Sequence, residues 1–311
     1  MKPKILFILH LPPPIHGAAM MGKYIQESEL INSSFDCFCI NLATAGSLSD
    51  IGHISLKKLL KYFFLLKHIS NVVREIRPEL VYITPNAGRK AFFKDFIVVQ
   101  MLKSMGCKVI AHYHNKGVSV YQSKWVYNFF YKRFFSNLKV ILLAENLYKD
   151  MAKYVKREDV YICPNGIPSS CKEEMEARRN NVIPHLLFLS NLLISKGVIV
   201  LLDALRILKE KGYLFNCQYV GGETAEINAM QFVVEVERRK LNDRVAYAGR
   251  KVGEEKNTFF QQADIFILPT MNECFPLVIL EAMEYKLPVI STNEGGIPDI
   301  VKDGENGLIC E

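Results

Sequence analysis

Two carboxylates eight positions apart, Glu273 and Glu281, stand in the stretch ECFPLVILE. Pro276 favours the first position of a helix, so a helix is expected to start within residues 274–276. The opening amides of a helix lack intrahelical partners and suit a phosphate group, while carboxylates accept hydrogen bonds from sugar hydroxyls. The pattern indicates a ligand that carries a diphosphate and hydroxyls, such as a nucleotide sugar. Glutamates at a helix start can also be purely structural, because the dipole favours them there.

The elements around this pair predict where such a site would lie. An apolar run at 263–270 reads as a buried strand, and a second strand is expected at 287–292, before a Gly-Gly turn and another helix start. This order is typical of a doubly wound α/β unit, which binds ligands at the carboxyl ends of its strands. Further strands are predicted at 4–9, 36–42, 80–84, 107–113, 139–144, 160–163, 185–190, 214–220 and 307–309.

These segments resemble the donor-binding half of the retaining glycosyltransferases of family four, whose GT-B fold has two facing Rossmann-like domains. The matching motifs are the paired Glu273 and Glu281, Lys196 in SKG, Asn165 and Gly166 in ICPNGI, Gly295 to Pro298, Gly17 in PPPIHGAAM and His114 in AHYHNKG. They follow the order of the family along most of the chain. The resemblance implies an α/β fold of two facing doubly wound domains.

The resemblance also implies roles for single residues. The donor-binding positions are Gly17, Asn191, Lys196, Gly197, Arg250, Phe275, Pro276, Leu277 and Glu281, and the catalytic positions are His114 and Glu273. Lys196 would hold the diphosphate. Five residues earlier, Asn191 replaces the usual arginine and brings hydrogen-bond donors without charge. Either the helix start at Phe275 and Pro276 or the guanidinium of Arg250 would then carry more of the diphosphate binding.

The carbohydrate end of the donor has its own expected partners. Glu281 would accept from the ribose hydroxyls and Glu273 from the transferred sugar, with His114 facing that sugar across the cleft. A histidine near a strand end can equally be a packed polar residue. His112 is expected to point to the opposite face, so that the two histidines would not act together.

The chain is expected to contain an acceptor-side domain at 1–166, a polar linker at 167–184 and a nucleotide-sugar domain at 185–311. Family members continue with further helices beyond the strand at 307–309, so the second domain is expected to be incomplete. No signal peptide precedes the first strand, and the eight cysteines show no disulfide or zinc spacing. A cytoplasmic protein without a metal cofactor is therefore expected.

Charge is divided unevenly along the chain. Residues 1–150 hold 20 Lys and Arg against 9 Asp and Glu, whereas residues 151–311 hold 19 against 23. Two basic stretches, 55–69 and 123–139, mix lysines with leucines and aromatics. In the first, a stripe of Leu56, Leu59, Leu60, Phe63 and Leu66 indicates a core helix or a helix that rests on an anionic membrane. No nucleic-acid-binding motif is present, so nucleic acid is not an expected partner.

The expected function is transfer of a sugar, with retention, from a nucleotide sugar to a glycan or lipid-linked acceptor, as in the synthesis of cell-surface polysaccharides. Two alternatives remain open. The chain could be a non-catalytic remnant that binds a nucleotide, or a nucleotide-sugar epimerase with the same two-domain architecture. Turnover by the 311-residue chain would exclude the remnant, and product analysis without an acceptor would reveal an epimerase.

Overall fold

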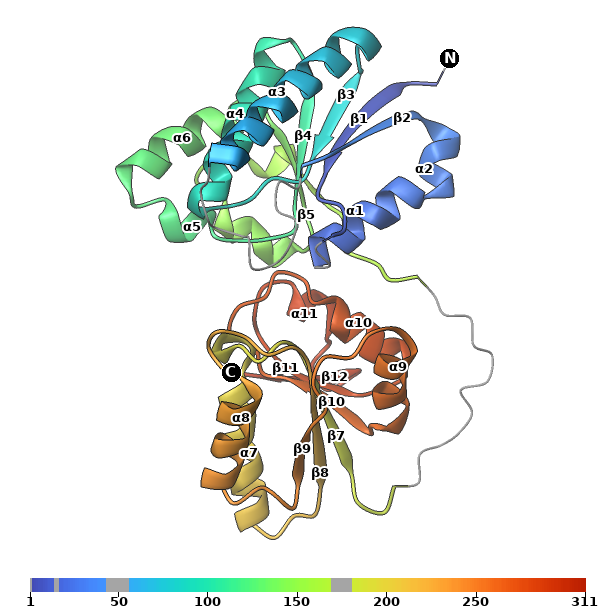
Figure 1. The fold of residues 1–311 in the computed structure, drawn as a ribbon, viewed down its shortest axis with the longest axis vertical. Helices are drawn as coiled ribbons and strands as arrows, with labels where there is room; N and C mark the ends of the chain where they lie inside the picture. Colours follow the sequence, from blue (N-terminus) through green and yellow to red (C-terminus); the bar gives the residue numbers. More distant parts are fainter. Residues whose placement is uncertain (1, 14–16, 43–55, 169–180) are drawn as a thin grey trace. The chain divides into compact units, whose positions relative to one another are not determined.

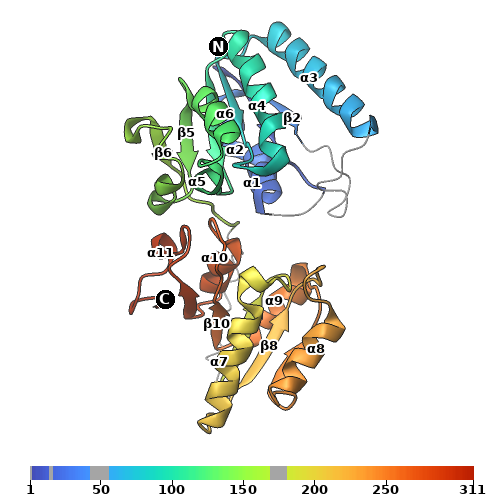
Figure 2. The ribbon, with the colours of Figure 1, turned by 90° about the vertical axis from the view of Figure 1, so that its left-hand side faces the viewer.

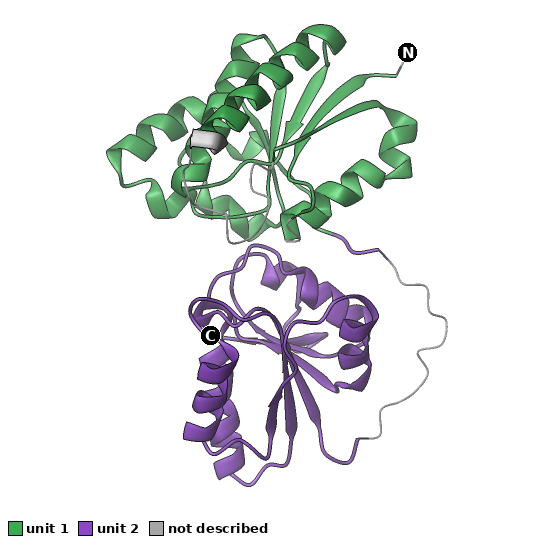
Figure 3. Ribbon diagram, viewed as in Figure 1, with its two compact units in different colours: residues 1–165 green, residues 166–311 purple. Residues whose placement is uncertain are grey.

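The computed structural model describes residues 2–13, 17–42, 56–168 and 181–311, without the side chains of residues 56–58. The chain forms two compact units, residues 1–165 (unit 1) and 166–311 (unit 2), shown in Figure 3. The division falls one residue before the predicted end of the first domain. Of the predicted linker, residues 169–180 lie outside the described part of the chain.

Unit 1 is built on a parallel six-stranded sheet in the order β2-β1-β3-β4-β5-β6 (Figure 1). The chain steps from β1 outward to β2 and then returns to β3 on the other side of β1, which makes β1 and β3 the switch point of this sheet. The strands are β1 (Lys4–Leu9), β2 (Asp36–Asn41), β3 (Leu80–Ile83), β4 (Val109–Tyr113), β5 (Lys139–Leu142) and β6 (Val160–Ile162).

Helices cover both faces of this sheet because each parallel crossover needs one. They are α1 (Gly17–Glu27), α2 (Glu29–Ser34), α3 (Leu56–Ile76), α4 (Arg89–Ser104), α5 (Val118–Tyr121) and α6 (Trp125–Phe135). Helices α3, α4 and α6 form one layer, and α1 and α2 lie on the other side of the sheet (Figures 1 and 2). Within the layer, α4 packs against both of its neighbours.

Helix α3 buries a different stripe from the predicted one. Its buried residues are Ile69 and Val73, whereas Leu59, Leu60 and Phe63 of the predicted stripe are more than half exposed. The core-helix interpretation is therefore wrong for these three residues. The helix is apolar around much of its circumference in its first half, so the 3.6-residue period could not decide which side meets α4 and the sheet.

Unit 2 is a second parallel sheet, in the order β12-β11-β10-β7-β8-β9. Its strands are β7 (His185–Leu189), β8 (Asn216–Val220), β9 (Val245–Tyr247), β10 (Ile265–Leu268), β11 (Val289–Thr292) and β12 (Gly307–Cys310). The strand order reverses between β7 and β10, which are neighbours in the sheet. The sequence did not predict β9, because three residues carry too little periodicity.

The helices of unit 2 are α7 (Val198–Glu210), α8 (Ala229–Arg238), α9 (Gly253–Gln262), α10 (Leu277–Glu284) and α11 (Ile297–Ile300). Helices α7 and α8 lie on one side of the sheet, and α9 and α10 lie on the other (Figure 1). The core between these layers includes the fully buried Phe188, Leu202 and Phe266. In the part of the chain that the structure describes, no helix is both long and apolar enough to cross a membrane.

Candidate functional site in unit 2

The loops after β7 and β10 meet at the switch point of the unit 2 sheet. The first loop, residues 190–197, ends in a single 3-10 turn at Ile194–Lys196, and the second spans residues 269–276. They are joined by the Met271 amide, which donates to the Ser195 carbonyl at 2.8 Å. In open α/β sheets ligands bind at this place, outside the carboxyl ends of the strands. The two loops carry Lys196 and Glu273.

Lys196 and Glu273 form an ion pair across these two loops. The Lys196 ammonium also donates to the Asn272 carbonyl at 3.0 Å. Both side chains are partly buried, with 19% and 18% of their surface exposed, so solvent screens the pair less than it would a surface pair. The structure thus brings together two of the predicted site residues and shows Glu273 as the direct partner of the cation.

Two glycines allow this close packing of loops. Gly197 has φ +81°, and a Cβ there would lie 2.0 Å from the Pro269 carbonyl oxygen. Gly295 has φ +57°, and a Cβ there would lie 2.3 Å from the Glu273 carbonyl oxygen. Both positions need the left-handed backbone that glycine adopts without strain. Gly197 therefore holds the β7 loop against the β10 loop.

Helix α10 begins at Leu277, beside the ion pair. The predicted start within 274–276 is wrong by at least one residue, because Pro276 keeps an extended backbone (φ −74°, ψ 113°) and is the N-cap. Its carbonyl accepts the first helical hydrogen bond, from the Ile279 amide at 3.2 Å. No side chain of the described chain caps this end. The amides of Leu277 and Val278 are thus available to an anion, while Phe275 is buried and Pro276 has no N–H.

Glu281 lies on α10, about one turn from its start, as the sequence predicted. Its carboxylate pairs with the Lys256 ammonium of α9 at 2.8 Å. The amide of Glu273 donates to the Glu294 carboxylate at 3.2 Å. Sequence reasoning missed Lys256 and Glu294, because partners supplied by other helices and loops leave no local spacing signal. Both predicted glutamates are held by neighbouring groups.

Asn191 and Arg250 lie near each other, on the loops after β7 and β9. The Asn191 side chain accepts from the Gly222 amide at 3.2 Å. A Cβ on Gly222 would lie 3.1 Å from this Asn191 oxygen and 3.8 Å from Cδ of Arg250. Arg250 is exposed and forms no ion pair within the described residues. A guanidinium without an ion-pair partner among the described residues therefore lies next to Asn191, where the resemblance implies an arginine.

The remaining predicted residues belong to unit 1. His114 follows β4 directly, and its two ring nitrogens are buried without a hydrogen-bond partner of the described chain. Burial lowers the pKa of His114 to about 4, although the nearby Asn165 side chain acts to raise it. His114 is therefore neutral near pH 7. A neutral imidazole can donate one hydrogen bond and accept another.

The expectation that His112 faces away from His114 is wrong. Their ring centroids are 4.2 Å apart, because side chains two residues apart in a strand share a face. His112 also bonds to the Tyr82 hydroxyl, and burial, together with His114, lowers its pKa to about 2. The two imidazoles form one buried neutral group at the carboxyl end of β4.

Gly17 opens α1, after β1 at the carboxyl edge of the unit 1 sheet. It is exposed, and nothing lies within 4 Å of where its Cβ would be. Residues 14–16 of the predicted glycine loop lie outside the described residues. The donor-binding role of Gly17 stays a prediction.

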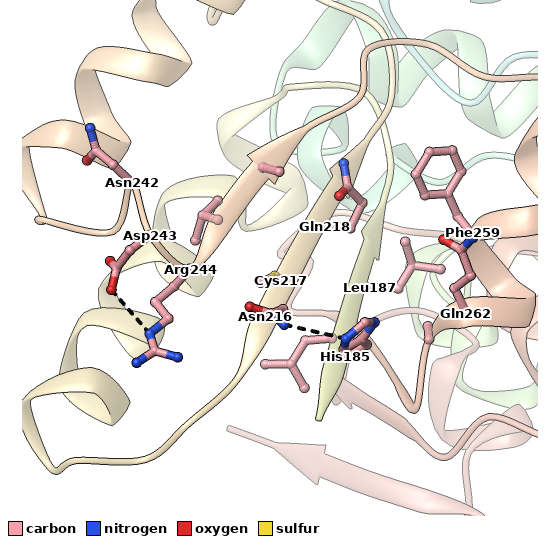
Figure 4. Close-up of a pocket in the computed structure, with 14 residues that line it drawn as sticks. His185, Leu187, Asn216, Cys217, Gln218, Asn242, Asp243, Arg244, Phe259 and Gln262 are labelled. Carbon is pink, nitrogen blue, oxygen red and sulfur yellow. Dashed lines mark hydrogen bonds and ion pairs between the residues drawn. The ribbon is translucent and has the colours of Figure 1, made fainter. Parts of the chain in front are cut away.

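A cavity of about 360 Å³ opens at the opposite edge of the unit 2 sheet (Figure 4). Its lining includes His185, Asn216 and Val245, the first residues of β7, β8 and β9. The Asn216 amide points to the His185 ring, and Arg244 pairs with Asp243 at 3.3 Å. None of the predicted site residues lines this cavity. Among the described residues, no group of three or more acidic, His or Cys side chains is placed to hold a metal ion.

Comparisons with known proteins agree with this architecture. Residues 173–311 match the family model described as glycosyl transferases group 1. The amylovoran biosynthesis glycosyltransferase AmsK of Erwinia amylovora is 25% identical over 245 residues, which cover 72% of this chain and 59% of AmsK. The putative colanic acid biosynthesis glycosyltransferase WcaL of Salmonella typhimurium is 31% identical over 37% of this chain and 29% of its own length. The chain thus spans less than two thirds of these relatives.

Two solved structures share the fold. Sucrose-phosphate synthase from Thermosynechococcus elongatus superimposes with a TM-score of 0.74 at 19% identity, covering 99% of this chain and 86% of its own. Anabaena HepE in complex with UDP superimposes with a TM-score of 0.71 at 18% identity, covering 99% of this chain and 85% of its own. Both likenesses establish the two-domain GT-B fold. The match to the model of glycosyl transferases group 1 is confined to residues 173–311, so the likeness in sequence to that family lies mainly in unit 2.

Proposed function

We propose that the chain is a retaining glycosyltransferase that moves a hexose or related sugar from a nucleotide-sugar donor to a glycan or lipid-linked acceptor. The observation that carries the proposal is the meeting of Lys196, Glu273 and the uncapped start of α10 at the switch point of unit 2. An ammonium and helix amides in one place suit a diphosphate, which gains negative charge as the sugar leaves it. AmsK and WcaL are named for the biosynthesis of polysaccharides, which supports a polysaccharide acceptor.

The donor would bind with its diphosphate between Lys196 and the first amides of α10. Gly197 would let the backbone of the β7 loop approach the phosphates, and Arg250 would supply the second positive charge that Asn191 lacks. Anabaena HepE, which shares the fold, was solved in complex with UDP. These points support a nucleoside diphosphate as the leaving group.

The carboxylates would hold the two carbohydrate ends of the donor. Glu281 would accept from the ribose and Glu273 from the transferred sugar, so Glu273 must exchange its bond to Lys196 for one to the donor. His114, neutral near pH 7, would hydrogen-bond the sugar or the acceptor without adding charge. In this scheme positive side chains and helix amides stabilise the leaving group, and we propose that no metal takes part.

We propose that the chain acts in the cytoplasm, at the inner face of the membrane, where lipid-linked acceptors are available. Incubation with a panel of nucleotide sugars and an acceptor mixture tests the activity, with nucleoside diphosphate release as the readout. We expect one donor to be consumed only when an acceptor is present, and the anomeric configuration of the product to match that of the donor.

Three outcomes separate this proposal from its alternatives. A folded chain that binds none of the nucleotide sugars would contradict the proposal. Binding without turnover would favour a non-catalytic remnant. Conversion of the donor to an isomer without acceptor would indicate an epimerase.

A further inference from the structure

The outer face of the α3, α4 and α6 layer in unit 1 exposes an unusual set of large apolar side chains. On α3, Leu59 and Leu60 are each 55% exposed, and Phe63 and Phe64 are each 62% exposed. These four residues occupy two successive turns and span about 140° of the helix circumference, and Leu60 and Phe64 lie opposite Ile69 and Val73, which face the core. Apolar residues gathered on one exposed face of a helix mark an interaction surface rather than ordinary scatter.

Helix α6 adds two aromatic residues to the same layer. Trp125 is 81% exposed and Phe129 is 50% exposed, one turn apart on α6. The guanidinium of Arg133 lies 5.5 Å from the centre of the Phe129 ring. Helix α4, between the two, exposes Ile97. An exposed tryptophan on a helix that also carries basic residues is typical of a membrane–water interface.

The layer is anchored to unit 1, so this face is not a loosely attached segment. The Tyr62 hydroxyl of α3 donates to the Lys94 carbonyl of α4 at 2.6 Å. Phe93 and Phe96 of α4 pack against Phe130 of α6, with ring centroids 5.3 and 4.8 Å apart. The outer face can therefore meet a partner as a preformed surface.

The charge of the layer selects the kind of partner. Together α3, α4 and α6 contain eleven Lys and Arg and two acidic residues, Glu75 and Asp95. Asp95 is buried, where its carboxylate accepts from the amide and side chain of Asn86, and Glu75 is exposed in the last turn of α3, next to Arg74. The exposed basic residues are Lys61, Lys67, Arg74, Arg89, Lys90, Lys94, Lys132 and Arg133. Apolar side chains among positive charges match the acyl boundary and headgroups of an anionic bilayer.

We propose that this face, defined by Leu59, Leu60, Phe63, Phe64, Trp125 and Phe129, docks unit 1 onto an anionic lipid bilayer. The apolar side chains enter the boundary between headgroups and acyl chains, and the surrounding lysines and arginines contact lipid phosphates. The inference stands on unit 1 alone. It does not depend on the proposed transferase activity, although it would bring a lipid-linked acceptor close to the enzyme.

Co-sedimentation with vesicles tests the surface, using phosphatidylcholine alone and phosphatidylcholine mixed with phosphatidylglycerol. The wild-type chain should pellet with the mixed vesicles, bind the neutral ones far more weakly and lose binding at high salt. The double substitution Phe63→Ser and Phe64→Ser should reduce the partition coefficient about tenfold or more, because two rings that would enter the bilayer are lost. The matched control is Val233→Ser with Val234→Ser, an adjacent exposed pair on α8 of unit 2, which should bind as the wild type does.

The single tryptophan of the chain gives a second readout. Emission from Trp125 should shift to shorter wavelength with the mixed vesicles and be quenched by lipids brominated on the acyl chains. All six residues are exposed, so the Phe63 and Phe64 variant should keep the melting temperature of the wild type.

Several results would overturn the proposal. The proposal is wrong if the wild-type chain stays in the supernatant with the mixed vesicles, or if it binds neutral vesicles equally well. It is also wrong if binding leaves the Trp125 emission unchanged, or if the Phe63 and Phe64 variant binds as the wild type does. A dimer in solution that the double substitution converts to a monomer would assign this face to a second copy of the chain instead.

Discussion

At the scale of single residues, the ion pair between Lys196 and Glu273 is the most informative feature of the site. A diphosphate and the Glu273 carboxylate would compete for the same ammonium. Glu273→Gln should therefore tighten binding of a nucleoside diphosphate by up to about fivefold, the value of a partly exposed ion pair, while slowing sugar transfer. Calorimetric titration and steady-state kinetics on the same variant measure the two effects.

Glu281→Gln is the control for this substitution, because its carboxylate pairs with Lys256 and is predicted to bind the ribose. It should weaken binding of the nucleoside diphosphate. If both variants weaken binding alike, Glu273 does not compete with the phosphates, and its proposed exchange between Lys196 and the sugar is wrong.

His114 gives the stability of unit 1 a pH dependence of known sign. Burial lowers its pKa from 6.5 to about 4, so the unfolded chain binds a proton in this window that the folded chain does not. The contribution of neutral His114 to the free energy of unfolding is fully present above pH 6.5. It is lost as the pH falls towards 4, by up to about 3 kcal/mol. The His114→Asn variant should lack this loss.

Urea unfolding followed by hydrogen-exchange mass spectrometry of unit 1 peptides measures the free energy of unfolding of unit 1 at pH values within and above the window. Other groups also titrate there: the pKa of Asp95 is raised to about 6 by burial, which has the opposite slope, and His112 has the same slope as His114. The difference between the wild type and the variant gives the contribution of His114 together with its effect on His112. A difference that does not change with pH would show that His114 titrates normally.

At the scale of elements, Gly197 fixes the β7 loop against the β10 loop. Gly197→Ala should reduce the free energy of unfolding of unit 2 by about 3 kcal/mol or more. The added Cβ would clash with the Pro269 carbonyl, and alanine would also be strained in the left-handed backbone at this position. Gly212 is the matched control, since it has φ +83° with nothing within 4 Å of its Cβ position. Gly212→Ala should cost only about 1 kcal/mol for the left-handed backbone.

Denaturant unfolding followed by far-ultraviolet circular dichroism compares these two variants. Equal losses would mean that the loop contact does not constrain position 197.

The sequence predicted the elements better than their contacts. The apolar runs of parallel strands are distinct, so eleven of the twelve strands were located, and only the three-residue β9 was missed. The paired glutamates and Lys196 could be proposed from the sequence because their motifs are local, and the structure brings Lys196 and Glu273 together. Lys256 and Glu294, which hold these glutamates, come from separate elements and give no such signal. The exposed side of α3 could not be chosen either, because apolar residues surround its first half.

At the scale of the whole molecule, the two units have separate sheets and separate switch points. A nucleoside diphosphate should therefore slow hydrogen exchange in the unit 2 loops 190–197 and 269–278, where Lys196 and the α10 amides lie. Exchange mass spectrometry with and without the ligand measures this directly. The β7, β8 and β9 amino ends, which line the cavity at the other edge of the sheet, serve as the internal reference and should not change. Protection centred on that cavity would move the nucleotide site there.

The central claim is that Lys196 binds the diphosphate of the donor, and titration calorimetry of Lys196→Ala with nucleoside diphosphates tests it most directly. Lys209→Ala is the control, because Lys209 is also an ion-paired lysine, at the far end of α7, with Asp243 as its partner. The account predicts that Lys196→Ala weakens the affinity more than about tenfold, as expected for loss of a charge-assisted bond, and that Lys209→Ala leaves it unchanged. Equal affinities for the wild type and a folded Lys196→Ala variant would contradict it.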